Sequence, residues 1–321
     1  MALKMRVPPF LEPTVSLIRE TFSEWNDDNA LELGAALSYY AIFSLAPLLV
    51  LAIAIAGTVY GDAAATGQLA ERLRGFVGPQ NAEFIQGLLA NARQPSSGIS
   101  TTTVLSGVFA LFLATAVFAE LQSALNKIWD VEPAPGEGLL VMIKGRLVSF
   151  VMVLGAGLLL LMLLVVTAGL STAQRYMGAF APAGIWWLAD YVVSIGIVTL
   201  MLALIFRALP DVEISWGDVW MGAFSTSLLF ALGRWMISLY LGHSGIRTTF
   251  GAAGSLAVFL TWVYYTSQIL FLGAEFTQVY AARYGSRIRP GEHMIEDERG
   301  DRLISVDQRE TEGNGDEDSR G

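Results

Sequence analysis

Arg234 stands inside the apolar stretch FALGRWMISLY, residues 230–240. An arginine at the centre of a bilayer costs about 2.5–3.5 kcal/mol on insertion scales, so it needs protein or water around it and a partner. Asp190 interrupts the preceding apolar run and reaches a similar depth if the two runs are antiparallel helices. The pair is a candidate intramembrane ion pair, or Arg234 binds an anionic ligand group. The alternative is that Arg234 extends to the outer surface while Asp190 lies among headgroups.

Polar residues also follow one face of the last apolar run. The residues Thr261, Tyr265, Gln268, Leu272 and Glu275 are spaced by 4, 3, 4 and 3 positions, which is helical spacing. The first run carries Tyr40 and Ser44, followed by Pro47, which removes a backbone hydrogen bond and is a candidate hinge. These faces either make interhelical hydrogen bonds, worth about 0.6 kcal/mol each, or line a polar cavity.

Four charged residues stand at the ends of apolar runs that should share one membrane surface. They are Glu120, Glu275, Arg146 and Arg207. One interpretation is a ring of ordinary helix-end charges at the interface. The sharper interpretation is an inner gate that ion pairs hold closed.

The sequence predicts no catalytic centre. A metal-dependent hydrolase needs a cluster of ligands, whereas this chain has two histidines, His243 and His293, and no cysteine. It lacks the GxxxxGK[ST] phosphate loop, and an RNA-binding protein would need a basic patch. The net charge is −9, and residues 291–321 contribute −7 of it, from eleven acids and four arginines. We therefore expect no enzyme, no cofactor, no metal site and no nucleic-acid partner.

The elements that must hold these residues are membrane helices. Hydrophobic residues make up 54% of the chain and charged residues only 15%, against about 25% in soluble domains. Six runs are long enough for the roughly 20 residues that span a bilayer. They are 33–61, 94–119, 147–174, 185–206, 219–242 and 248–274. Their apolar residues surround each helix, which is atypical of a soluble amphipathic helix.

The flanking segments complete the predicted organisation. Residues 1–32 form a cytoplasmic segment whose part 10–32 has helical apolar spacing and should lie along the inner surface. The six-helix domain covers 33–284, with short extracytoplasmic helices in 62–98, and 285–321 is an acidic disordered tail. Outside the distal tail, ten Lys and Arg residues fall on the side of the termini and five on the other. This asymmetry puts both termini in the cytoplasm.

Several separated segments resemble one family. They are LGAALSYYAIFSLAPLLVL from residue 33, LNKIWDVEP from 125, FRALPDVEISWGDVWMGAF from 206, LGRWMISLYL from 232 and FGAAGSLAVFLTWVYYTSQILFLGAEF from 250. Over residues 21–284 the chain resembles the YihY/virulence factor BrkB family of bacterial inner-membrane proteins. The resemblance implies an all-α bundle of six transmembrane helices. Some members carry the label ribonuclease BN, which the residues present here do not support.

We therefore expect a transporter, flippase or channel-like protein that moves a lipid-like or small solute across the bacterial inner membrane. The rival hypothesis is a non-catalytic scaffold that organises envelope partners through its outer helices and tail. Membrane lipids are expected partners in either case, and a homo-oligomer is compatible with both. A polar pocket at membrane depth separates the hypotheses, because only a transporter needs one.

Overall fold

The computed structural model describes residues 12–60, 101–134, 183–243, 254–285, 289–290 and 294–296, with scattered positions in 82–87 and 144–172. Most of the expected extracytoplasmic segment 62–98 and the distal tail lie outside the described residues. So do the first eleven residues.

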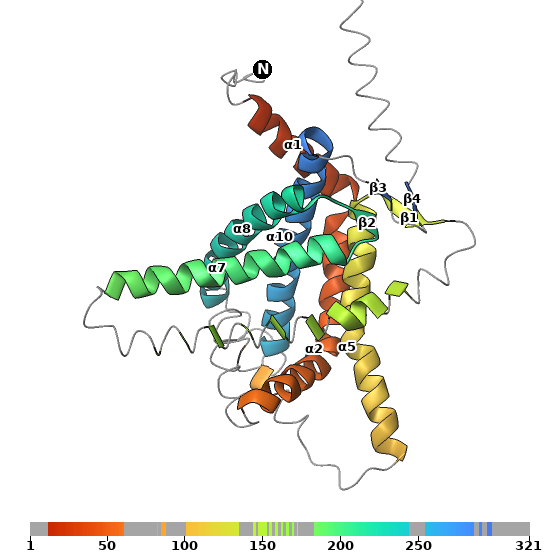
Figure 1. Ribbon diagram of the computed structural model, residues 1–321, viewed down its shortest axis with the longest axis vertical. Helices are drawn as coiled ribbons and strands as arrows, with labels where there is room; N and C mark the ends of the chain where they lie inside the picture. Colours follow the sequence, from red (N-terminus) through yellow and green to blue (C-terminus); the bar gives the residue numbers. More distant parts are fainter. Residues whose placement is uncertain are drawn as a thin grey trace, which may run out of the picture.

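Long helices dominate the described residues (Figure 1). They are α1 (Glu12–Asp27), α2 (Ala30–Tyr60), α5 (Thr101–Ile128), α7 (Ala183–Ala208), α8 (Trp216–His243) and α10 (Gly254–Tyr284). Three stretches are long and apolar enough to cross a membrane, namely Ala30–Leu48, Tyr191–Ala208 and Gly254–Tyr284. The protein is therefore all-α. The number of six spans stays a prediction, because the third run is described only at separate helical positions.

Helix α10 is the centre of the described bundle and contacts α1, α2, α5 and α8 (Figure 1). Helix α5 packs on α2, and α7 packs on α8. The core lies where the end of α5 meets the end of α7 and the middle of α10. Leu125, Phe206 and Phe271 are fully buried there. Burial of large apolar side chains at the ends of α5 and α7 stabilises the positions of the loops that follow these two helices.

Small residues bring α8 and α10 into close contact. Gly222 of α8 faces Thr277 of α10, and Gly273 of α10 faces Thr226 of α8. A Cβ added at Gly222 would lie 1.8 Å from Thr277 Oγ1, and one at Gly273 would lie 2.0 Å from Thr226 Oγ1. Each threonine hydroxyl donates to a carbonyl one turn earlier in its own helix, so no polar group is stranded at the contact. Reciprocal packing of this kind is typical of membrane helices, where close backbone approach replaces a hydrophobic driving force.

Two short antiparallel strand pairs cover the end of the bundle where α5, α7 and α10 finish. Strand β1 (Val131–Pro133) pairs with β4 (Met294–Glu296), and β2 (Val212–Glu213) pairs with β3 (Arg289–Pro290). The sequence placed 289–296 in a disordered tail, and the structure corrects this for the residues in β3 and β4. The tail was misread because its backbone hydrogen bonds go to distant loops, which leave no periodic signal in so short a segment.

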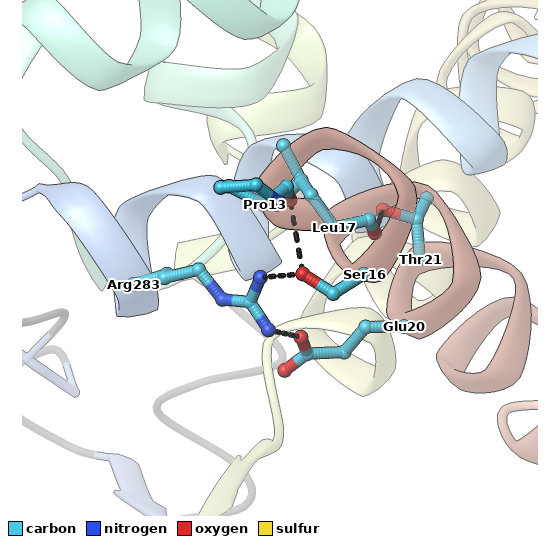
Figure 2. Close-up of polar contacts among 6 residues, drawn as sticks. All are labelled: Pro13, Ser16, Leu17, Glu20, Thr21 and Arg283. Atoms are coloured by element: carbon cyan, nitrogen blue, oxygen red, sulfur yellow. Dashed lines mark hydrogen bonds and ion pairs between the residues drawn. The ribbon is translucent and has the colours of Figure 1, made fainter. Parts of the chain in front are cut away.

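Helix α1 is joined to the end of α10 by a polar contact (Figure 2). The Arg283 guanidinium donates to Ser16 Oγ at 2.7 Å and to Glu20 Oε2. The Ser16 hydroxyl in turn donates to the Pro13 carbonyl at 3.0 Å. The same helix leaves Val15, Ile18 and Phe22 exposed, so its apolar face points away from the described bundle. An exposed apolar face is what a helix lying on a membrane surface requires.

Exposed apolar side chains also cover the long helices. On α8 they include Leu228, Leu232 and Met236, which are 45%, 56% and 52% exposed. On α7 they include Leu188 and Val192, 54% and 59% exposed. In water, bands of this extent would drive aggregation. A lipid environment removes that cost, so these faces are the lipid-facing side of a membrane protein.

Candidate functional site

Glu275 is the least expected residue in the core. It lies in the third turn from the end of α10 and is 0% exposed. Neither of its carboxylate oxygens accepts a hydrogen bond from any part of the chain that the structure describes. A buried charge without a donor is strongly unfavourable, so an unpaired carboxyl at this depth calls for an explanation.

The groups around Glu275 are themselves acidic. Asp28, Glu24 and Asp130 act on it, and Asp28 lies within reach of a side-chain hydrogen bond. Two ionised carboxylates only accept hydrogen bonds, so this contact forms only when one of them carries a proton. We call Glu24, Asp28, Asp130 and Glu275 the carboxyl cluster. Burial raises the pKa of Glu24 to about 7, and the charges of Asp130 and Asp28 add to the rise.

Donors near Glu275 are directed to other acceptors. Lys127 Nζ donates to the backbone carbonyl of Asp28 at 2.5 Å, and Gln278 Nε2 donates to Asp130 Oδ2 at 2.8 Å. The buried indole N–H groups of Trp25 and Trp129, next in sequence to Glu24 and Asp130, have no acceptor among the described residues. This end of the bundle therefore has an excess of acid over base.

Two sharp turns bring the acidic residues together. Asn29 has a φ of 56°, which ends α1 and lets α2 start at Ala30 in a new direction. Asp130 has a φ of 51° directly after α5, where the chain turns into β1. Asparagine and aspartate tolerate this left-handed conformation better than most residues. Both turns place acidic residues beside the last turns of α10.

The predicted polar face of α10 continues inward to Glu275. Gln268 Nε2 donates to the carbonyl of Ala30 at 3.2 Å, whereas its buried Oε1 has no donor among the described residues. Gln268 and Glu275 are two helical turns apart, roughly 10 Å at 1.5 Å per residue. Tyr265 lies against Gly233 of α8, because a Cβ added there would be 3.1 Å from the hydroxyl oxygen. The Thr261 hydroxyl donates within its own helix, to Ala257.

The predicted polar residues of the first run divide between two roles. Ser44 is fully buried and donates to the Leu113 carbonyl of α5 at 2.6 Å, an interhelical hydrogen bond. Tyr40 is 38% exposed and meets Tyr39 edge to face. Pro47 lies inside α2, whose two halves run in different directions in Figure 1. Its role as a hinge stays a prediction.

The predicted gate residues are not brought together as a described ion-paired group. Glu275 belongs to the carboxyl cluster, and Glu120 is half-buried in α5. The Arg207 guanidinium carbon lies 6.0 Å from the ring centre of Trp216, a cation–π distance. Arg146 lies outside the described residues. The gate therefore stays a prediction. Glu275 lies beside other carboxyl groups, whereas the gate would require arginines there.

The Arg234 and Asp190 pair also stays a prediction. Arg234 belongs to α8 and Asp190 to α7, and these helices pack against each other. The side chains of both residues lie outside what the structure describes.

Sequence reasoning missed a second polar centre, at Asp211. This buried carboxylate accepts from Gln122 Nε2 at 2.9 Å and Asn126 Nδ2 at 3.1 Å, both on α5. Its backbone N–H donates to Asn126 Oδ1 at 2.8 Å, and Lys144 Nζ lies 3.5 Å from Oδ1. The network joins the end of α7 to α5 and satisfies its polar atoms, so its role is structural. Asp211 and Asp130 both stood in motifs quoted for their resemblance, but spacing alone assigned them no partner.

Apolar, lipid-facing helices and a polar interior define the class: this is an α-helical membrane protein. A model of the virulence factor BrkB family matches residues 21–295, so the chain belongs to that family.

The relatives that the chain matches are named UPF0761 membrane proteins. The chain is 26% identical over 255 residues to a UPF0761 membrane protein of Alcanivorax borkumensis, covering 78% of this chain and 57% of the relative. It is 27% identical over 282 residues to one of Rhodospirillum centenum, covering 85% and 59%. The chain thus spans about three fifths of the length of the curated relatives it matches. No solved structure matches it.

Proposed function

We propose that this chain is a gradient-driven transporter or flippase for a lipid-like or small amphiphilic solute, and that it is not an enzyme. It would cross the bacterial inner membrane six times with both termini in the cytoplasm. One observation carries the proposal. The interior face of α10 holds two buried acceptor groups, the Glu275 carboxyl and Gln268 Oε1, to which no described N–H or O–H group donates.

A purely structural polar face would be fully hydrogen-bonded, as Ser44 and the Asp211 network are. Buried acceptors without a donor in the protein are explained where a water molecule, a proton or a polar group of a ligand binds to them. A scaffold for envelope partners has no need of such groups inside the bundle. Among the described residues, no three or more acidic, histidine or cysteine side chains are placed to hold a metal ion.

The test uses purified protein in liposomes that contain phosphatidylethanolamine and phosphatidylglycerol with a fluorescent label on the headgroup. A membrane-impermeant reductant destroys the label in the outer leaflet only. Lipid movement then appears as loss of more than about half of the signal, since about half of the lipid lies in each leaflet of a large vesicle. Small amphiphilic dyes trapped inside the vesicles test the other substrate class in the same preparation.

The informative variant is Gln268→Leu, which removes both the amide donor and the unsatisfied acceptor from the polar face. The matched control is Ser123→Leu, because Ser123 is an exposed polar residue within α5 and the change again puts leucine in place of a polar side chain in a helix. We expect the parent and the control to move a probe and Gln268→Leu to move it at least several-fold more slowly. If the parent moves no lipid and no dye, or if Gln268→Leu is as active as the control, the transporter proposal is wrong.

A further inference from the structure

We propose that Glu275 and Asp28 form a proton-binding site in which one proton is shared between the two carboxyls. The inference deepens the proposed function, on which it rests, by naming the proton as the coupling ion. The site lies where α10 meets the turn between α1 and α2. It is distinct from the Arg234 region and from the polar contacts around Asp211.

The first argument is geometric. Glu275 is 0% exposed, and no described N–H or O–H group donates to it, while the Asp28 carboxyl is within hydrogen-bonding reach. If both carboxyls are ionised, two acceptors face each other in a buried place. If one carries a proton, it donates to the other, and Glu275 gains the hydrogen bond that it otherwise lacks. Carboxyl pairs held this closely share one proton because like charges cannot both persist there.

The second argument concerns which cation fits. A metal ion needs several oxygen ligands at short, defined distances. Although four acidic residues gather here, no group of three or more among the described residues is placed to hold a metal. Both Glu275 oxygens are sealed from solvent, which leaves no room for an ammonium headgroup. A proton is the one cation that needs only two oxygens and no volume.

Charged and polar groups from each neighbouring element lie around the pair. Helix α1 contributes Glu24, α5 contributes Lys127, whose ammonium is bound to a backbone carbonyl, and the turn after α5 contributes Asp130. From α10 itself, the Gln278 amide is used by Asp130. Helix α8 packs on the opposite face of α10 and presents uncharged Gly222 and Thr226 there. The start of α2 offers the Ala30 carbonyl, which Gln268 occupies.

Because of its location, binding or release of the proton changes the contact between α10 and the joint of α1 and α2. Asp28 lies one residue before Asn29, whose positive φ forms the joint between α1 and α2. Helix α1 is held to α10 further along by Arg283, Ser16 and Glu20 (Figure 2). Releasing the proton places two negative charges face to face and pushes the joint away from α10. Binding it restores the contact, so protonation closes this end of the bundle and deprotonation opens it.

Infrared difference spectroscopy tests the site directly, without any substrate. The full chain carrying Glu24→Gln, which removes the neighbouring carboxyl whose pKa lies near 7, is the parent here, and every variant is made in this background. It is taken in lipid from alkaline to neutral pH while the C=O stretching band of protonated carboxyls is recorded. We expect a band in the parent at neutral pH that shifts in D2O, and its loss in Glu275→Gln and in Asp28→Asn. The control Glu32→Gln removes an exposed carboxyl from the first turn of α2 and should keep the band.

Three results would overturn the site. They are the absence of the band in the parent, its survival in both Glu275→Gln and Asp28→Asn, or its removal by sodium or calcium ions at constant pH, which would assign the cluster to a metal. Because Glu275→Gln and Asp28→Asn change different parts of the fold, the test still gives an answer if one of the two variants does not fold.

The transport assay separates this inference from the function it deepens. With a pH gradient across the liposomes, probe movement by the parent should depend on its direction, and Glu275→Gln should lose that dependence. A carboxyl band without any probe movement would refute the transporter and leave the proton site standing. Probe movement that ignores the pH gradient, with no band, would refute the proton coupling alone.

Discussion

The close contact between α8 and α10 makes a quantitative prediction for Gly222→Ala. The added Cβ would lie 1.8 Å from Thr277 Oγ1, 2.7 Å from its Cβ and 2.8 Å from its Cγ2. Ordinary contact begins near 3.4 Å, so the shortfall at Oγ1 is 3.4 − 1.8 = 1.6 Å. Rotating the threonine cannot relieve the clash because its Cβ stays in place, so the helices must separate.

Overpacking of this kind costs about 1–3 kcal/mol of unfolding free energy. Replacing glycine by alanine inside a helix also brings a gain of up to about 1 kcal/mol, which would hide part of the loss. Gly196→Ala is therefore the control, because Gly196 is an exposed glycine within α7 and nothing lies within 4 Å of its added Cβ. The gain cancels between the two variants. We expect Gly222→Ala to be about 1–3 kcal/mol less stable than Gly196→Ala.

The measurement is reversible unfolding in mixed micelles of detergent and SDS, followed by tryptophan fluorescence. Thr277→Gly should restore part of the stability of Gly222→Ala, because it removes the three atoms nearest to the new methyl group, although a glycine within α10 itself costs about 1 kcal/mol. If Gly222→Ala and Gly196→Ala unfold at the same SDS fraction, the helices do not approach as closely as described and the reasoning fails.

Three further predictions concern the end of the bundle. Asp211→Ala strands the buried amide of Gln122 and the half-buried amide of Asn126, and should cost about 2–4 kcal/mol in the same assay. The exposed Glu213→Ala should be neutral, and equal effects of the two changes would refute the network. Because burial raises the pKa of Glu24 from 4.5 to about 7, the stability that its protonated form contributes is lost as the pH rises through about 7. Glu24→Gln should therefore raise the melting temperature at pH 8 and change it little below pH 4.5; a pH-independent difference would contradict this. Truncation after Asp297 should leave melting unchanged, but truncation after Gly291 removes β4 and should lower the melting temperature; identical melting would show that the β1–β4 pair contributes nothing.

Titration of the carboxyl cluster cannot be recognised from the overall composition of the chain. The net charge of −9 comes mainly from the distal tail, so titration of the whole chain mainly reports the carboxyls of the tail. The carboxyl cluster is a small part of that charge, yet its Asp28 and Glu275 are buried. Variants in the cluster are therefore needed to separate its proton from those of the tail.

Much of the fold was predictable because a bilayer imposes simple rules. Long uncharged runs must become helices, since lipid offers no partners to backbone N–H and C=O groups. The chain accordingly forms α2, α7, α8 and α10 over the apolar runs expected of it. Helical spacing likewise identified the α10 face that carries Gln268 and Glu275. These features follow from local pattern and solvent alone.

Contacts between distant residues could not be predicted in this way. Glu275 was expected at an interface beside arginines, but the fold places it among carboxyls from α1 and from the turn after α5. Residues 289–296 were expected to be disordered, but part of them pairs with the loops after α5 and α7. Periodicity predicts which face of a helix or strand is apolar, but it does not predict which residues pack against that face. The sequence therefore determined the membrane helices and their polar faces. Only tertiary packing decided which charged groups lie together. Their proximity depends on turns such as those at Asn29 and Asp130 and on contacts between residues more than a hundred positions apart.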